Sequence, residues 1–149
     1  MNKPLIEKLA ALDKLNPSTK QLWGKMSPQH MVEHLIMAVT ISNGKLKVEC
    51  FNPPEKIPVL KRFLQSPRPL PQLFINPLIG EKLLPFQYKN LDEAKSVLRT
   101  EVEDYYTFFD DNPNTVLINP TFGELNKHEW DIFHEKHFTH HFQQFEIDS

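Results

Sequence analysis

The sequence predicts an all-α fold, a four-helix bundle with a long proline-rich crossover between its second and third helices. Four stretches carry apolar residues at three- and four-residue steps, which is the period of an amphipathic helix. Eight of the 13 prolines lie between Pro53 and Pro85, where they prevent a continuous helix. The 149 residues correspond to one domain, residues 1–149, long enough to bury a core of its own.

The first two helices are expected over residues 3–15 and 27–43. The first carries leucines at helical spacing and ends before Asn16-Pro17. The second begins at Ser27-Pro28, because a serine hydroxyl caps free N–H groups and proline suits the first helical position. Gly44 closes this helix. It is apolar nearly all round, so we expect it to be buried on most sides.

The proline-rich segment covers residues 45–88, and within it a short helix is expected over residues 58–65. A loop of this length inside one domain usually has a function or serves as a crossover. We therefore expect it to cover one end of the bundle and to shape a substrate entrance. Its apolar residues predict that it packs on the domain: Phe51, Leu60, Phe63, Leu64, Leu73, Phe74, Ile75 and Phe86.

The last two long helices follow this segment. The third begins at residue 90 or 92 and runs to about residue 110, with the carboxylate of Glu101 among its inward positions. A turn at residues 119–123 leads into the fourth, which is expected over residues 126–145. Its start is marked by Asn126 and Glu129, which have the spacing of a reciprocal capping box.

Five of the seven histidines fall in the predicted last helix. His134, His137 and His141 share one face with its aromatic residues, whereas His128 and His140 fall off that face. His137 and His141 stand one turn apart, so their rings can converge on one ion at the ~2.0–2.1 Å that imidazole nitrogens require. The alternative is a set of core histidines, each hydrogen-bonded within the protein.

The second helix adds His30 and His34, which are again four residues apart. Burying two imidazoles in so apolar a helix is costly unless they have a partner. His34 lies nearer the middle of the helix, whereas His30 lies in the first turn and can face water. The run His134-Glu135-Lys136-His137 is not the HExxH motif of zinc peptidases, because its second histidine comes one residue too early.

Composition and charge limit the classes of partner that the chain can bind. The net charge of -2, with both signs interspersed, gives no basic surface for a nucleic acid. The longest apolar run, residues 35–41, is too short to span a membrane, so no membrane partner is expected. The N-terminus lacks a secretory signal. A single cysteine, Cys50, excludes a disulfide within the chain and suits a reducing compartment. We expect a cytoplasmic protein with a small-molecule substrate, and leave a homodimer open.

Three stretches of the chain resemble the DinB superfamily of helical bundles, in particular its YfiT-like branch. They are Trp23-Gly24-Lys25-Met26-Ser27 with residues 29–35, Asn119-Pro120-Thr121-Phe122-Gly123, and Glu129-Trp130 through His137, His140-His141 and Gln144. Together they cover roughly a third of the chain, at both ends. The resemblance implies a four-helix bundle whose second helix supplies one metal-binding histidine and whose last helix supplies an H-x-x-x-H pair.

Carried over to this chain, the implied ligands are His34, His137 and His141. We therefore expect a mononuclear metal enzyme that holds Zn²⁺ or Ni²⁺, which nitrogen ligands favour over Mg²⁺, with an open position for water. Hydrolysis of a small molecule is the leading hypothesis, with Glu101 as a catalytic base or as a partner of a ligand.

Two alternatives remain: a thiol S-transferase that uses the same ion, as some DinB-like proteins do, and a non-catalytic binding protein with a structural histidine cluster. A di-iron carboxylate enzyme is excluded, because it needs a Glu-x-x-His motif twice and this chain has none.

Overall fold

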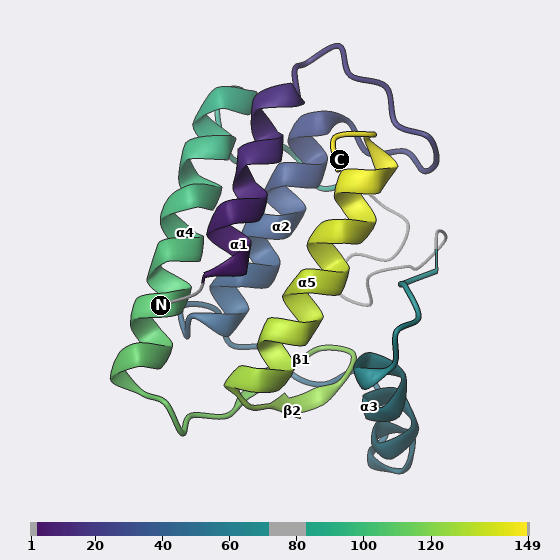
Figure 1. Cartoon of the computed structure of the whole chain (residues 1–149), viewed down its shortest axis with the longest axis vertical. Coiled ribbons are helices and arrows are strands. Elements are labelled where there is room, and N and C mark those ends of the chain that lie inside the picture. The colour runs from purple at the N-terminus through teal and green to yellow at the C-terminus, as the bar shows by residue number, and fades with distance from the viewer. Residues whose placement is uncertain (1–2, 72–82, 149) are drawn as a thin grey trace.

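The computed structural model of the chain describes residues 3–71 and 83–148. Most of these residues are helical: α1 (Pro4–Lys8), α2 (Pro28–Ser42), α3 (Ile57–Gln65), α4 (Leu91–Asp111), α5 (Lys127–Gln144) and two short 3₁₀ helices, η1 (Leu9–Lys14) and η2 (Pro54–Lys56). Strands β1 (Leu117–Asn119) and β2 (Gly123–Leu125) form a small antiparallel sheet. Helices α1, α2, α4 and α5 lie side by side, and α3 lies next to the small sheet, at the lower right of the view (Figure 1).

The starts of the long helices agree with the predicted caps. At α5, the backbone N–H of Glu129 donates to Asn126 Oδ1 at 2.9 Å, and the N–H of Asn126 donates to Glu129 Oε1 at 3.1 Å. At α2, the N–H of His30 donates to Ser27 Oγ at 3.2 Å. The reciprocal acceptor is the Nδ1 atom of His30, which accepts the N–H of Ser27 at 3.2 Å. The capping box of α2 therefore uses an imidazole where glutamate or glutamine is usual.

The prediction of one helix over residues 3–15 is wrong in part. A single α-helical turn is followed by the 3₁₀ helix at Leu9–Lys14, and Leu15 is already extended. Leu9, Leu12 and Leu15 are spaced by three residues, and all three are buried. Side chains three apart eclipse one another in a 3₁₀ helix, so this tighter turn places Leu9 and Leu12 on the same side, against the core, and Leu15 follows in extended chain.

The prediction of an all-α fold missed the small sheet. Leu117 pairs with Leu125, and Asn119 pairs with Gly123. The turn between them is held by Asn119, whose Oδ1 accepts the N–H groups of Thr121 at 2.8 Å and Phe122 at 3.0 Å. Each strand has only three residues, which is too short for an alternating pattern to be recognised in the sequence.

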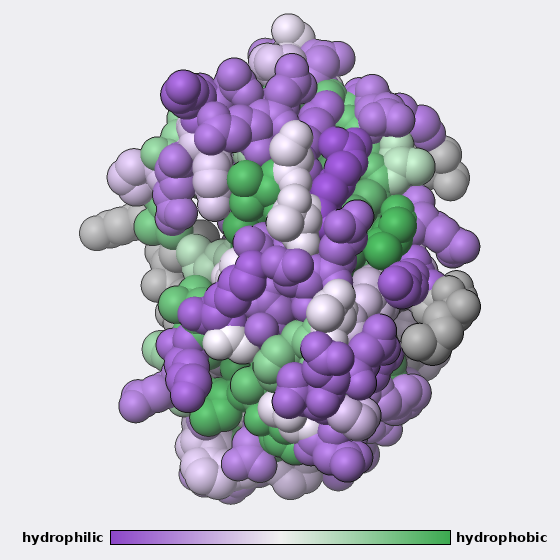
Figure 2. Space-filling model, turned by 90° about the vertical axis from the view of Figure 1, so that its left-hand side faces the viewer, coloured by the Kyte–Doolittle hydropathy of each residue, from purple (hydrophilic) through white to green (hydrophobic). Residues whose placement is uncertain are grey.

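Helix α2 lies at the centre of the fold. It packs most extensively on α4 and also contacts α5 and β1. As predicted, it is buried on most sides: Met31, Val32, Leu35 and Val39 are fully inaccessible to solvent. The face of the molecule on the α4 side, by contrast, is mostly hydrophilic with apolar residues scattered over it (Figure 2). Among the helices of residues 3–71 and 83–148, none combines the length and the apolar character needed to cross a bilayer.

The proline-rich segment is attached to the helices at two places. Near the middle of the segment, the carbonyls of Ser66 and Arg68 accept from Lys136 on α5, the first at 2.7 Å. At the end of the segment, the N–H groups of Gln87 and Tyr88 donate to Glu33 on α2 at 2.8 and 3.4 Å. These contacts tie the segment to the helices that carry the predicted ligands.

The prediction that the apolar residues of this segment pack on the domain is confirmed for Leu64, which is buried, and for Leu60 and Phe63, which are partly buried against the core. It is wrong for Phe51 and Phe86, which are 73% and 52% exposed. Phe51 lies in a bend and Phe86 directly follows Pro85, and neither belongs to a helix or a strand that packs on the core. Leu73, Phe74 and Ile75 lie outside the described residues.

Candidate metal centre

Three histidines converge between α2 and α5: His34 from α2, and His137 and His141 from α5. The Nε2 atoms of His34 and His137 are 2.9 Å apart. One ring nitrogen from each residue can be chosen so that all three lie within 4.8 Å of one another. Only 7%, 4% and 7% of these residues, respectively, is exposed. The structure thus brings together the three residues that the sequence analysis predicted as ligands.

The placement of this cluster follows from local structure. His137 and His141 are one turn apart and lie on one face of α5. Helix α2 packs against that face, and His34 is its seventh residue, near the middle. The ring centroid of His34 lies 4.8 Å from that of His137 and 4.8 Å from that of His141. The rings meet edge to face and do not stack on one another.

All three rings are neutral near pH 7. Burial lowers the pKa of His34 to about 4, with a smaller contribution from the nearby His140. Burial also lowers the pKa values of His137 and His141 well below the ordinary range, and the neighbouring histidines lower them further. A neutral imidazole keeps one unprotonated nitrogen, and this is the form that ligates a metal ion.

The cluster has the size required by one ion. Two nitrogens at 2.0–2.1 Å from a tetrahedral ion lie about 3.3–3.4 Å from each other. The nitrogens here span separations from 2.9 Å to no more than 4.8 Å, so modest ring movements bring all three to that distance. Three histidines that are close enough to hold a metal ion thus form one buried group.

Hydrogen bonds inside the protein leave this cluster incomplete. The Nδ1 atoms of His34 and His137 are buried and have no hydrogen-bond partner among residues 3–71 and 83–148. A buried polar atom without a partner destabilises a protein by about 1–3 kcal/mol. Nδ1 of His134, outside the cluster, is in the same situation, so the unpartnered atoms do not single out a metal ion. The atoms that one ion can bridge are the facing Nε2 atoms of His34 and His137, 2.9 Å apart.

His134 belongs to a different environment, although it is one turn from His137 and fully buried. Its Nε2 lies 2.7 Å from the hydroxyl oxygen of Ser42. That hydroxyl donates its hydrogen to the carbonyl of Val39 at 2.9 Å, so it accepts from His134 Nε2–H. The ring also stacks on Trp130 at 5.4 Å. His134 is therefore a core histidine with a protein partner, and it is not part of the cluster.

The other two predicted polar residues also lie apart from the cluster. His30 caps α2 and packs on the ring of Phe86 at 4.4 Å. Glu101 accepts from Asn43 Nδ2 at 2.8 Å and pairs with Lys45 Nζ at 2.9 Å. Asn43 is nine residues beyond His34, which is about 13 Å along the helix. A catalytic role for Glu101 stays a prediction, since its described contacts are all at this end of α2.

Two polar residues next to the cluster were not recognised from the sequence. His140 was placed off the inner face, but it is buried because Trp23 covers it, with ring centroids 5.6 Å apart. Gln144 lies at the end of α5, and its Oε1 is 2.8 Å from Nδ1 of His141. Neither could be found from helical periodicity, because the covering segment before α2 has no regular structure.

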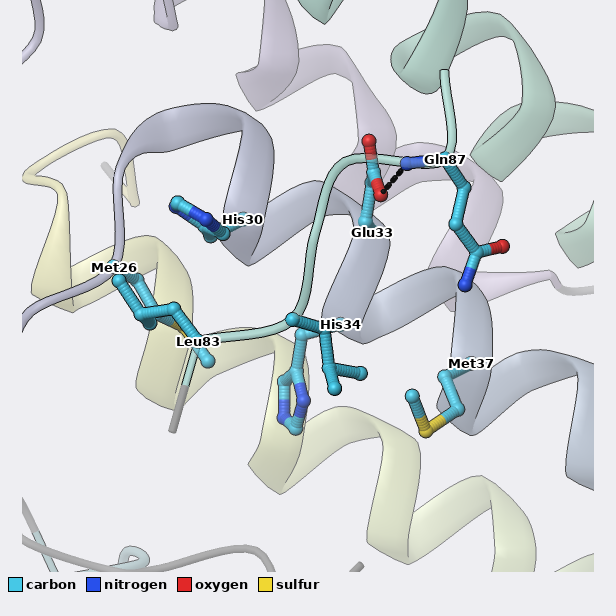
Figure 3. Close-up of a pocket in the computed structure, with 8 residues that line it drawn as sticks. Met26, His30, Glu33, His34, Met37, Leu83 and Gln87 are labelled. Carbon is cyan, nitrogen blue, oxygen red and sulfur yellow. Dashed lines mark hydrogen bonds between the residues drawn. The ribbon is translucent and has the colours of Figure 1, made fainter. Parts of the chain in front are cut away.

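A small pocket adjoins His34 (Figure 3). Its volume of about 30 Å³ is enough for one or two water molecules. Its apolar lining comes from Met26, Met37, Leu83 and Leu84. Glu33 also borders it, but points away from His34 toward the backbone N–H of Gln87. A solvent molecule or a small group can thus lie beside one of the three histidines.

Comparisons of the chain with protein-family models, with curated proteins and with solved structures find no match. The candidate metal centre is therefore defined by its own geometry: three buried, neutral imidazoles, two unpartnered nitrogens and an adjoining pocket.

Proposed function

We propose that this chain is a mononuclear metal enzyme that hydrolyses a small molecule, with His34, His137 and His141 as the ligands. The observation that carries the proposal is the convergence of three buried imidazoles within 4.8 Å. The predicted ligands are the residues of this group, which supports the resemblance to the DinB superfamily. The side-by-side arrangement of α1, α2, α4 and α5 is in keeping with a DinB-like four-helix bundle (Figure 1).

The residues around the cluster define the chemistry. Neutral nitrogen ligands favour Zn²⁺ or Ni²⁺ over Mg²⁺, and three neutral ligands leave the charge of the ion uncompensated. Such an ion would supply Lewis acidity, either lowering the pKa of a coordinated water to about 7 for hydrolysis or stabilising a thiolate for S-transfer. His34 faces the small pocket, so the open position is expected on that side.

The thiol S-transferase is kept as the second candidate because of the lining of this pocket. Met26, Met37, Leu83 and Leu84 are uncharged, and thioether side chains adapt to soft, polarisable groups. A structural histidine cluster without catalysis is the third candidate, in which the facing Nε2 atoms of His34 and His137 share a hydrogen bond at 2.9 Å in place of an ion. A substrate for hydrolysis has to place only a small group in the pocket, and the rest of the molecule can lie outside it.

Metal content tests the proposal. We expect about one divalent ion per chain after purification without a chelator, or after loading with zinc, nickel or manganese, measured by plasma mass spectrometry. His137→Ala should lose most of the bound ion. The matched control is His128→Ala on the same helix, where the histidine is exposed, and it should retain the ion. A wild-type protein that takes up none of the three metals would refute the proposal.

The open position is tested with the cobalt-substituted protein. Azide or a small thiol should change its visible spectrum, because three protein ligands leave room for a fourth. A spectrum that never changes would indicate a closed, structural site. The same titration of Glu101→Gln tests whether this carboxylate affects the ion at all.

A further inference from the structure

Gln144 links the third histidine of the cluster to a segment at the other end of the chain. Its side chain is buried, with its Oε1 2.8 Å from His141 Nδ1 and its Nε2 donating to the carbonyl of Trp23 at 2.8 Å. Its backbone carbonyl accepts the N–H of Leu22 at 2.7 Å. Three hydrogen bonds therefore fix this one residue, and two of them come from the segment before α2.

These contacts determine which nitrogen of His141 carries the hydrogen. The carbonyl of Trp23 can only accept, so the amide nitrogen of Gln144 must face it and the amide oxygen must face His141. The oxygen can only accept, so Nδ1 of His141 must be the protonated nitrogen. The remaining nitrogen, Nε2, then has a free lone pair, as a metal ligand requires.

We propose that Gln144 is a positioning residue of the metal centre, and that residues 22–24 hold Gln144 in place. This inference rests on the proposed function. Partners of this kind fix the tautomer and orientation of a ligating ring, and their loss typically weakens metal binding 10–100-fold. His141 is also the one histidine of the three whose second nitrogen has a partner within the described ranges, 3–71 and 83–148. It is therefore the preorganised ligand to which the other two can adjust.

Gly24 makes the close approach of the two segments possible. Its φ of +80° is in the region that favours glycine, and a Cβ atom there would lie 2.9 Å from Gln144 Nε2. Any side chain at this position would therefore displace the amide that holds His141. Gly24 therefore matters for the metal centre, although it acts through Gln144 and not through a direct contact with a ligand.

The test compares Gln144→Met with Gln143→Met. Both substitutions have the same chemistry, but Gln143 is exposed and makes no contact with His141 among the hydrogen bonds found. We expect Gln144→Met to bind zinc about 10–100-fold more weakly in competition with a chromophoric chelator. Gln143→Met should match the wild type within about twofold. Equal affinities of the two variants would overturn the inference.

A second measurement uses the metal-free protein. Long-range ¹H–¹⁵N correlation spectra should show His141 protonated on Nδ1 in the wild type and a mixture of tautomers in Gln144→Met. An unchanged tautomer in the variant would also overturn the inference. This readout separates the two proposals: if the wild type binds no zinc, the proposed function fails, but the tautomer still decides the role of Gln144.

Gly24→Ala keeps the question testable if Gln144→Met fails to fold. Its matched control is Gly44→Ala, where φ is +83° and a Cβ would also meet a side chain, that of Phe108, at 3.0 Å. Both substitutions strain a left-handed turn, so both should lower stability. Only Gly24→Ala should weaken zinc binding, and equal zinc affinities in this pair would contradict the role of residues 22–24.

Discussion

His134 and His137 stand one turn apart on the same helix, both are buried, and burial lowers both pKa values. They differ in their partners. Nδ1 of each ring is without a partner among the described residues, and the difference lies at Nε2: His134 donates to the Ser42 hydroxyl, whereas His137 meets Nε2 of His34. Burial therefore does not distinguish a core histidine from a candidate ligand. The acceptors and donors around each ring make that distinction.

The largest effects are expected for His137→Ala and His134→Ala, and they should differ in kind: the first should lose zinc affinity and the second should lose stability. His137→Ala should weaken zinc binding more than about 100-fold, since it removes a ligand and not only a ligand's partner. His134→Ala should change zinc affinity by less than about threefold but lower the free energy of unfolding by about 2–4 kcal/mol, because it opens a cavity beside Trp130. Zinc competition and urea unfolding of both variants measure the two effects. Loss of zinc in His134→Ala would place that residue in the metal centre.

A second prediction concerns the loss of folding stability in acid. Burial lowers the pKa of His134 to about 3 in the folded protein, from an ordinary value of 6.5. Between these values the unfolded chain binds a proton that the folded chain does not, so the free energy of unfolding falls as the pH falls. The slope is about 1.4 kcal/mol per pH unit for this residue, and the stability is fully present above pH 6.5.

Urea unfolding of the metal-free protein between pH 7.5 and 5 measures this slope. His134→Phe should reduce it by about one proton, because phenylalanine does not titrate. The buried His34, His137 and His141 act in the same direction, so part of the slope should persist in this variant. A slope unchanged by His134→Phe would mean that His134 binds its proton as readily in the folded chain as in the unfolded chain.

The smallest effect is expected for Ser42→Ala. The change leaves His134 Nε2–H without its acceptor, which should lower the free energy of unfolding by about 1–2 kcal/mol without changing zinc affinity. The control is Ser96→Ala at an exposed position of α4, which should stay within about 0.5 kcal/mol of the wild type. Equal stability of the two variants would show that His134 does not depend on Ser42.

The sequence was most informative where chemistry is local. The caps at Ser27 and Asn126 predicted the starts of α2 and α5, and the four-residue spacing of His137 and His141 placed them on one face. Helical periodicity does not give the position of a residue along a bundle, which is why Glu101 was expected near the cluster but lies at the far end of α2.

Contacts between distant parts of the chain could not be predicted from the sequence. Gln144 and Trp23 are 121 residues apart, and their contact depends on an irregular segment whose path no periodic pattern encodes. The burial of His140 has the same cause, because Trp23 of this segment covers its ring. Sequence reasoning thus found the three histidines of the cluster but not the residues that surround them.

The imidazole in the capping box of α2 has a consequence for the order in which the molecule responds to acid. Nδ1 of His30 accepts the N–H of Ser27 only while the ring is neutral, whereas a glutamate in that position would go on accepting down to about pH 4. Partial burial lowers the pKa of His30 below 6.5, but His30 is less buried than the histidines of the core. Mild acid should therefore remove this hydrogen bond from the first turn of α2, which borders the pocket beside His34, before it protonates the three histidines of the cluster.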